Sequence, residues 1–207
     1  MNSYLTISLK QILMTSIDNK DIVLDKQLLE NCLKELGALL KKKGGHHRLC
    51  YELIIVGGAS IVLNYCFRLS TMDVDCVDEF GLLMNEVVEE IAAKHNLPHN
   101  WINTNFVNTK SYSEKLSQYS SFYKSYANET LIVRTIKDEY LIAMKLVSAR
   151  KYKNDYADIY GIIEESRNSG KEITLKSLET AIINLYGSYK NIDPLALEFV
   201  KKIIEDK

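Results

Sequence analysis

The stretch that decides the fold is Tyr51-Glu52-Leu53-Ile54-Ile55-Val56-Gly57-Gly58-Ala59-Ser60. It begins with a largely apolar run rich in β-branched side chains, which is typical of a buried strand. Gly57 and Gly58 then predict a tight turn into a helix over residues 59–67, because glycine has no Cβ and adopts left-handed backbone conformations. Main-chain N–H groups at the start of such a helix bind phosphate groups. The stretch therefore predicts a strand, a phosphate-binding turn and a helix.

Two aspartates follow on what the pattern predicts to be a second strand, Met72-Asp73-Val74-Asp75-Cys76-Val77. Because side chains alternate along a strand, Asp73 and Asp75 would share one face, roughly 6.6 Å apart. Two like charges so close raise each other's pKa unless a cation neutralises them. Mg²⁺ prefers one or two carboxylates together with substrate phosphates. The pair therefore predicts a metal ion that binds with a nucleoside triphosphate.

The order of these features resembles the nucleotidyltransferase superfamily, whose members have the DNA polymerase β-like fold. The resemblance is carried by Val56-Gly57-Gly58-Ala59-Ser60 and Arg68-Leu69-Ser70-Thr71-Met72-Asp73-Val74-Asp75. This variant looks most similar to the AbiEii-type toxins and related minimal nucleotidyltransferases. A second block, over residues 138–159, is similar to that group's later motif, a helix with a lysine and an arginine followed by Asp-x-x-Asp. Together the blocks span roughly residues 49–163.

The resemblance implies an α/β (α+β) fold in which helices flank a mixed sheet and a helical bundle follows. We expect one continuous fold, with a nucleotidyltransferase core and its N-terminal helix over residues 1–136 and a C-terminal helical subdomain packed on the core over 137–207. The periodicity predicts strands over 101–107 and 131–136 and helices over 26–43, 81–95, 138–150, 155–168, 175–186 and 194–205. The last helices would form a lid packed on the sheet.

The resemblance also implies transfer of a nucleotidyl group from a nucleoside triphosphate to an acceptor hydroxyl, with release of pyrophosphate. Asp73 and Asp75 would hold one or two Mg²⁺ or Mn²⁺ ions. Gly57 and Gly58, together with Ser60, would bind the β- and γ-phosphates. Most relatives carry Gly-Ser where this chain has two glycines, so a serine contact would have to come from Ser60.

In the later motif, Lys145 would act as a point charge on the phosphates, and Asp155 would be a further catalytic residue. A solvated surface position is the alternative for Lys145. Asp158 shares a helix face with Asp155 and is expected either to contact the nucleotide or to cap the helix dipole. Lys145 and Asp155 converge only if the chain reverses direction near residues 151–154.

Two arginines are further candidates for nucleotide binding. Arg68 precedes the aspartate strand and Arg150 follows Lys145. Each would hold phosphates or form an ion pair with the nearby acids. The resemblance does not assign a third metal carboxylate, because Glu129, Asp138 and Glu139 only flank an apolar strand. That gap motivates an alternative function, a catalytically inactive module that binds nucleotide or a partner protein.

The acceptor stays open among RNA or tRNA, a protein and a small molecule, and a toxin role would imply a cognate antitoxin. A Ser- and Lys-containing segment carries the aromatic residues Tyr112, Tyr119, Phe122, Tyr123 and Tyr126. Such a segment either stacks bases at an RNA surface or forms the packed edge of an insertion. Acceptor recognition is expected there.

The composition is that of a soluble globular protein, with 207 residues, 46% hydrophobic and 26% charged, and a net charge of −1. This near-neutral charge argues against a protein that coats DNA non-specifically. We expect a cytoplasmic protein without membrane association, because no segment approaches the ~20 apolar residues of a membrane span.

Cysteine and histidine positions favour no zinc site. The cysteines Cys32, Cys50, Cys66 and Cys76 lie singly within apolar segments and are expected to be reduced core residues. His46 and His47 follow a double glycine in a polar turn, where an exposed pair is expected and metal binding is the alternative.

Overall fold

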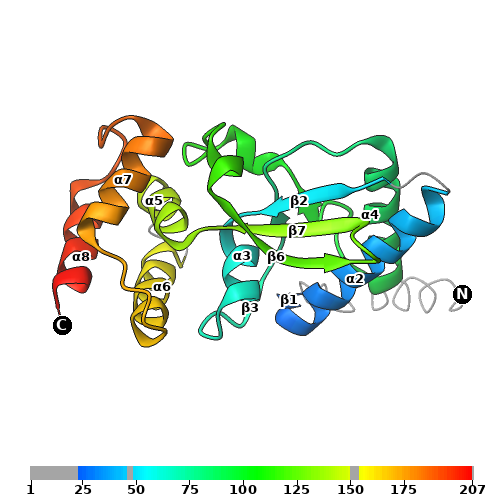
Figure 1. Ribbon diagram of the computed structural model, residues 1–207, viewed down its shortest axis with the longest axis horizontal. Coiled ribbons are helices and arrows are strands. Elements are labelled where there is room, and N and C mark those ends of the chain that lie inside the picture. Colours follow the sequence, from blue (N-terminus) through cyan, green and yellow to red (C-terminus); the bar gives the residue numbers. More distant parts are fainter. Residues whose placement is uncertain (1–22, 46–48, 150–153, 207) are drawn as a thin grey trace, which may run out of the picture.

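Residues 23–45, 49–149 and 154–206 are described by the structure, a computed structural model (Figure 1). The helices are α2 (Lys26–Lys43), α3 (Gly57–Asn64), α4 (Leu82–His95), α5 (Asp138–Ser148), α6 (Asp155–Asn168), α7 (Leu175–Tyr186) and α8 (Pro194–Glu205), with 3₁₀ turns η1 (Asn105–Asn108) and η2 (Leu116–Tyr119). The strands are β1 (Leu24–Asp25), β2 (Tyr51–Ile55), β3 (Ser70–Thr71), β4 (Val74–Asp75), β5 (Ile102–Asn103), β6 (Ser120–Tyr126) and β7 (Leu131–Ile136). No helix in these ranges is long and apolar enough to cross a membrane.

A mixed sheet forms the centre of the fold and confirms the predicted fold class. β7 lies between β2 and β6, parallel to the former and antiparallel to the latter. β4 and β5 form a parallel pair, which an antiparallel bridge between Ile55 and Cys76 joins to β2. The Val56 N–H donates to the Asp75 carbonyl over 2.9 Å at this junction. The end of β2 and the aspartate strand are therefore neighbours.

Helices α2 and α4 pack together over one face of this sheet. Their buried side chains form one cluster with Leu53, Ile55 and Val133 of the sheet. Asp25 caps α2 by accepting from the Leu28 N–H over 2.8 Å. Leu82 is 92% exposed at the first position of α4, where it precedes the buried face of the helix.

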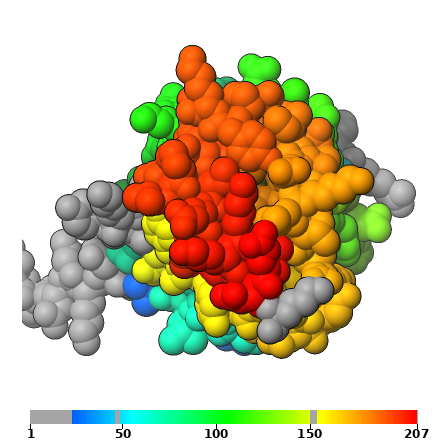
Figure 2. Space-filling model, turned by 90° about the vertical axis from the view of Figure 1, so that its left-hand side faces the viewer, coloured from blue at the N-terminus to red at the C-terminus, as the bar shows by residue number. Residues whose placement is uncertain are grey.

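The C-terminal helices pack on one another beyond the end of β7. α5 lies against α6 and α7, and α6 lies against α8. Figure 1 places this bundle at the end of the sheet, and Figure 2 shows α7 and α8 on the outer surface there. The bundle core continues into the sheet through Ile54, Val56 and Ile136. The predicted bounds of α6, α7 and α8 are confirmed, and Thr174 and Asp193 cap the last two.

Several predicted elements differ from the observed ones. The aspartate segment is not one strand, since a bend at Met72 separates β3 from β4 and Asp73 lies outside both strands. The strand predicted over 101–107 is limited to β5, which a 3₁₀ turn soon follows. The strand β6 was not predicted at all, because its outward side chains are polar and pairing with β7 stabilises it. The short strand β5 and the polar strand β6 each depend on pairing with another strand, β4 and β7 respectively.

The predicted burial of the cysteines is half right. All four thiols are free, and Cys32 and Cys76 are buried. Cys50 and Cys66 are exposed instead, since each lies beside an element end rather than within it. Burial raises the pKa of the Cys32 thiol to about 11. His46 and His47 lie outside the described residues.

Candidate active site

The glycine turn lies at the carboxyl end of β2, where α3 begins. Gly57 has φ +63°, a left-handed conformation that side-chain-bearing residues rarely adopt. A methyl group at Gly57 would lie only 3.3 Å from Asp75 Oδ2, so the Asp75 carboxylate lies against the turn. Val56 precedes α3 without a side-chain cap, and the first-turn N–H groups of a helix have no intrahelical partner. The turn therefore combines helix N–H donors with a carboxylate.

Asp73 lies just before the short strand β4, and Asp75 lies within it. Asp73 is exposed and Asp75 is half-buried. The Thr71 hydroxyl donates to the Asp73 carbonyl over 3.2 Å and holds the bend. Asp73 therefore lies outside regular strand structure, contrary to the prediction that both aspartates share one strand face.

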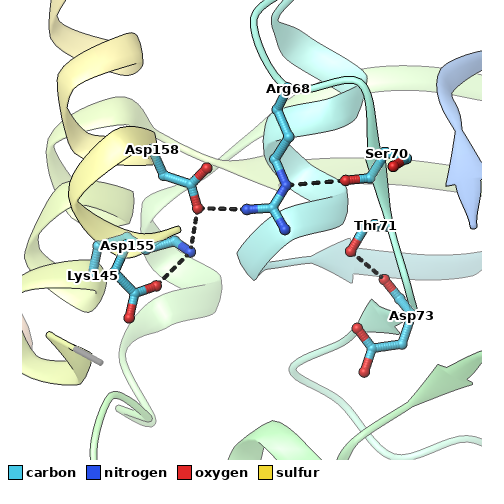
Figure 3. Close-up of polar contacts among 7 residues, drawn as sticks. All are labelled: Arg68, Ser70, Thr71, Asp73, Lys145, Asp155 and Asp158. Carbon is cyan, nitrogen blue, oxygen red and sulfur yellow. Dashed lines mark hydrogen bonds and ion pairs between the residues drawn. The ribbon is translucent and has the colours of Figure 1, made fainter. Parts of the chain in front are cut away.

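Arg68 connects three parts of the site (Figure 3). Its Nε donates to the Ser70 carbonyl over 3.2 Å, and its Nη1 donates to Asp158 Oδ2 on α6. A methyl group at Gly58 would lie 2.6 Å from Arg68 Nη2 and 2.8 Å from Thr71 Oγ1. The guanidinium group thus covers Gly58 and ties the aspartate segment to α6. Of its two predicted roles, the structure places Arg68 in the ion pair.

Lys145 lies in a buried cluster with both aspartates of the later motif. Its Nζ is 2.9 Å from Asp155 Oδ1 and 2.7 Å from Asp158 Oδ2. Lys145 is 6% exposed, Asp155 is fully buried and Asp158 is 2% exposed. The surface alternative for Lys145 is therefore wrong. Asp158 Oδ2 accepts from both Lys145 and Arg68, so one carboxylate oxygen joins the two cations (Figure 3).

A reversal of the chain brings these residues together. α5 ends at Ser148, and Ala149 has the left-handed φ of 34° before α6 begins at Asp155. The predicted break between the helix that carries Lys145 and the helix that carries Asp155 is therefore confirmed. Asn154 occupies the N-cap position, but its side chain makes no capping hydrogen bond. Arg150 lies outside the described residues, so its predicted role stays a prediction.

Ser60 is placed differently from the other turn residues. It is fully buried in α3, and its hydroxyl has no hydrogen-bond partner among the residues that the structure describes. A phosphate contact through this hydroxyl would require a shift of the helix. The predicted role of Ser60 is untested.

The sequence did not single out Gly161, although it shapes the site. A methyl group at Gly161 of α6 would lie 2.5 Å from the Phe67 ring. Phe67 therefore packs directly on the α6 backbone and positions the adjacent Arg68. An isolated glycine within a helical pattern is a signal for such close packing.

The two aspartates can provide part of the ligand set of a Mg²⁺ ion. Asp73 and Asp75 provide two carboxylates, and Mg²⁺ takes its remaining ligands from phosphates and water. Within the described ranges, no three or more His, Cys, Asp or Glu side chains gather closely enough to hold a metal ion alone. Asp138 accepts from the Tyr65 hydroxyl over 2.5 Å and from the Ser166 hydroxyl over 3.2 Å. Asp138 therefore belongs to a separate hydrogen-bond network with Tyr65 and Ser166.

Most aromatic residues of the 112–126 segment pack inside the fold. Tyr119 stacks on Tyr140 with ring centroids 3.9 Å apart, and the Tyr123 hydroxyl donates to Glu30 over 2.5 Å. Tyr126 is buried, whereas Phe122 is 61% exposed. Of the two predicted arrangements, the segment therefore resembles a packed edge, from which the Phe122 side chain projects into solvent.

We expect Gly58→Ala to displace Arg68 from Asp158. The new methyl group would overlap the guanidinium group, and this overpacking should lower the free energy of unfolding by about 1–2 kcal/mol. Urea denaturation measures the loss. In an Arg68→Ala background the same substitution should have a smaller effect, whereas an unchanged effect would contradict the contact. Gly81→Ala, which enters open space, is the control.

Comparison with protein families adds an independent finding. A family model described as a nucleotidyltransferase of unknown function (DUF6036) matches residues 31–192. Comparisons with curated proteins and with solved structures give no significant match. The matched range contains the glycine turn, the aspartate segment and the cluster on α5 and α6.

Proposed function

Because this chain belongs to that nucleotidyltransferase family of unknown function, we propose that it transfers a nucleoside monophosphate from a nucleoside triphosphate to an acceptor hydroxyl. The observation that carries the proposal is the contact of the Asp75 carboxylate with the glycine turn. It brings a metal-binding side chain next to helix N–H groups that bind phosphate. A triphosphate with its metal ion needs both groups in one place.

The chain's own residues would bind and orient the triphosphate. The N–H groups after Gly57 and Gly58 would hold the β- and γ-phosphates, while Asp73 and Asp75 would hold Mg²⁺ or Mn²⁺. When bound, the metal ion supplies charge neutralisation and alignment for in-line attack. The acceptor oxygen would bond to the α-phosphorus while its proton passes to solvent water. The bond to the β-phosphate then breaks, and pyrophosphate leaves.

The cluster on α5 and α6 would supply positive charge beside the phosphates. Lys145 and Arg68 both contact Asp158, and Asp155 holds the same ammonium group. We assign Asp155 and Asp158 the role of orienting these two cations. Phosphate oxygens would then compete with the carboxylates for Lys145, so nucleotide binding is expected to loosen the cluster.

Finer assignments rest on the resemblance alone. Similarity to AbiEii-type toxins supports a toxin-like role with a cognate antitoxin, and it leaves RNA or tRNA, protein and small molecules as acceptors. A second candidate is an inactive module that binds nucleotide or a partner protein. Lys145 is paired with two carboxylates, so its ammonium group is not directed at an open phosphate site. This arrangement favours the inactive module.

The deciding experiment follows label from α-³²P nucleoside triphosphates in the presence of Mg²⁺ and cell extract. Transfer should stop when EDTA removes the metal ion, and the size of the labelled product would identify the acceptor class. The Asp73→Ala, Asp75→Ala double variant controls for contaminating enzymes. Tight triphosphate binding without transfer of any nucleotide would overturn the proposal in favour of the inactive module.

A further inference from the structure

A cavity lies at the opposite end of α3 from the glycine turn. Its volume is about 710 Å³, within the range of small-molecule sites. Asn64 and Tyr65 line it from the end of α3, and Ser121 and Thr135 line it from the sheet. Since α3 has eight residues at a rise of ~1.5 Å each, the cavity is about 10 Å from the turn. The cavity is thus distinct from the proposed triphosphate site.

Carboxylates dominate the charged lining of this cavity. The acidic residues are Asp138, Glu139, Glu165 and Glu172, whereas the basic residues are Lys137 and Lys171. None of the four acids forms an ion pair within 4.0 Å with another residue that the structure describes. The cavity therefore carries an excess of negative charge, which repels phosphate and attracts cations.

The hydrogen bonds inside the cavity preserve this negative charge. Asp138 accepts from two neutral hydroxyl groups, those of Tyr65 and Ser166. Burial and the nearby Asp138 charge raise the pKa of Tyr65, which keeps its hydroxyl protonated as a donor. The hydroxyl groups of Tyr65 and Ser166 thus hold the Asp138 side chain in position, and neither of them brings a positive charge to it.

An exposed aromatic ring at the same cavity gives an independent reason to expect an organic cation. Phe122 lines the cavity from β6 and is 61% exposed, while most aromatic neighbours in its segment pack inside the fold. Aromatic faces attract ammonium groups electrostatically, so an exposed ring can bind a cation together with neighbouring carboxylates. Hydroxyl groups of Ser121 and Ser169 add hydrogen-bond acceptors for N–H donors.

We propose that this cavity binds a small organic molecule with two or more protonated amino groups. The carboxylates pair with the ammonium groups, Phe122 covers the aliphatic or cationic part, and the hydroxyl groups accept the remaining N–H donors. The site goes beyond the proposed transfer reaction, since it is separate from the glycine turn and binds its ligand with or without a triphosphate.

Isothermal titration calorimetry with spermidine at low ionic strength tests this site. The full chain should bind one spermidine per molecule, and a neutral diol of similar length, 1,8-octanediol, should not bind. Glu165→Gln combined with Glu172→Gln should weaken binding at least ~10-fold, because neutral amides replace two of the carboxylates that pair with the ammonium groups. Phe122→Ala should weaken it about 3-fold. Binding should also weaken as salt screens the charges.

The matched control is Glu89→Gln combined with Glu114→Gln, which removes the same charge from two exposed acids elsewhere. It should leave spermidine binding unchanged. Equal weakening in both double variants would overturn the site, as would no binding up to about 10 mM spermidine or equal binding of the diol. Thermal unfolding checks that each variant folds. If the Glu165 and Glu172 variant does not, an unchanged affinity in Phe122→Ala overturns the site.

Discussion

Lys145→Met is expected to lower the free energy of unfolding by about 3–5 kcal/mol. Lys145 contacts Asp155 and Asp158, and all three side chains are almost fully excluded from water. Methionine fills the space of the lysine stem but supplies no charge, so two buried carboxylates lose the ammonium that they share. Urea denaturation followed by circular dichroism gives the change.

Two further variants make this prediction specific. Lys202→Met breaks an exposed pair with Glu198, whose side chain is 61% exposed, and should change stability by less than about 1 kcal/mol. Adding Asp155→Asn to Lys145→Met should restore part of the loss, because a neutral amide is buried more easily than a carboxylate. A Lys145→Met variant within about 1 kcal/mol of the native chain would contradict the buried cluster. If the single variant does not fold, a folded double variant would still show that the unpaired Asp155 carboxylate causes the loss.

Asp75→Asn is expected to lower nucleotidyl transfer about 10³-fold while changing the free energy of unfolding by less than about 1 kcal/mol. Asparagine keeps the shape of the side chain beside Gly57 but removes the charge that would hold Mg²⁺. The loss in rate corresponds to about 4 kcal/mol of transition-state stabilisation. Single-turnover transfer of α-³²P label measures it, and calorimetry with Mg²⁺ and a triphosphate measures binding.

Asp78→Asn is the matched control, since Asp78 is an exposed aspartate three residues further along the same segment. It should retain native activity. A similar loss in both variants would show that the effect comes from the charge of the segment and not from a metal ligand at the turn. Full activity in Asp75→Asn would remove Asp75 from the proposed site.

Together, the two predictions assign different physical roles to carboxylates that the resemblance grouped in one site. Asp155 and Asp158 are buried beside Lys145, so their removal is expected to lower stability. Asp73 is exposed and Asp75 is half-buried, and their loss is expected to lower transfer. A variant that lowers transfer through Lys145 must therefore be checked for folding before its effect is assigned to phosphate binding.

Local patterns in the sequence were sufficient for much of the fold. The strand before Gly57 and the helices α6, α7 and α8 were predicted because hydrophobic periodicity and capping residues act within a few positions. The double glycine predicted the turn for the same reason, since the backbone conformation of Gly57 depends on its missing Cβ. Two such local blocks in order also predicted a nucleotidyltransferase, which the family match over residues 31–192 confirms.

Only the tertiary structure decided which side chains meet. The sequence placed Lys145 ten positions before Asp155, but the reversal at Ala149 and the packing of α6 made them partners. Likewise, Arg68 meets Asp158, which lies 90 positions later on α6, and Phe67 packs on Gly161 of the same helix. Periodicity records which face of an element is buried, whereas contacts between distant residues depend on the packing of the whole chain.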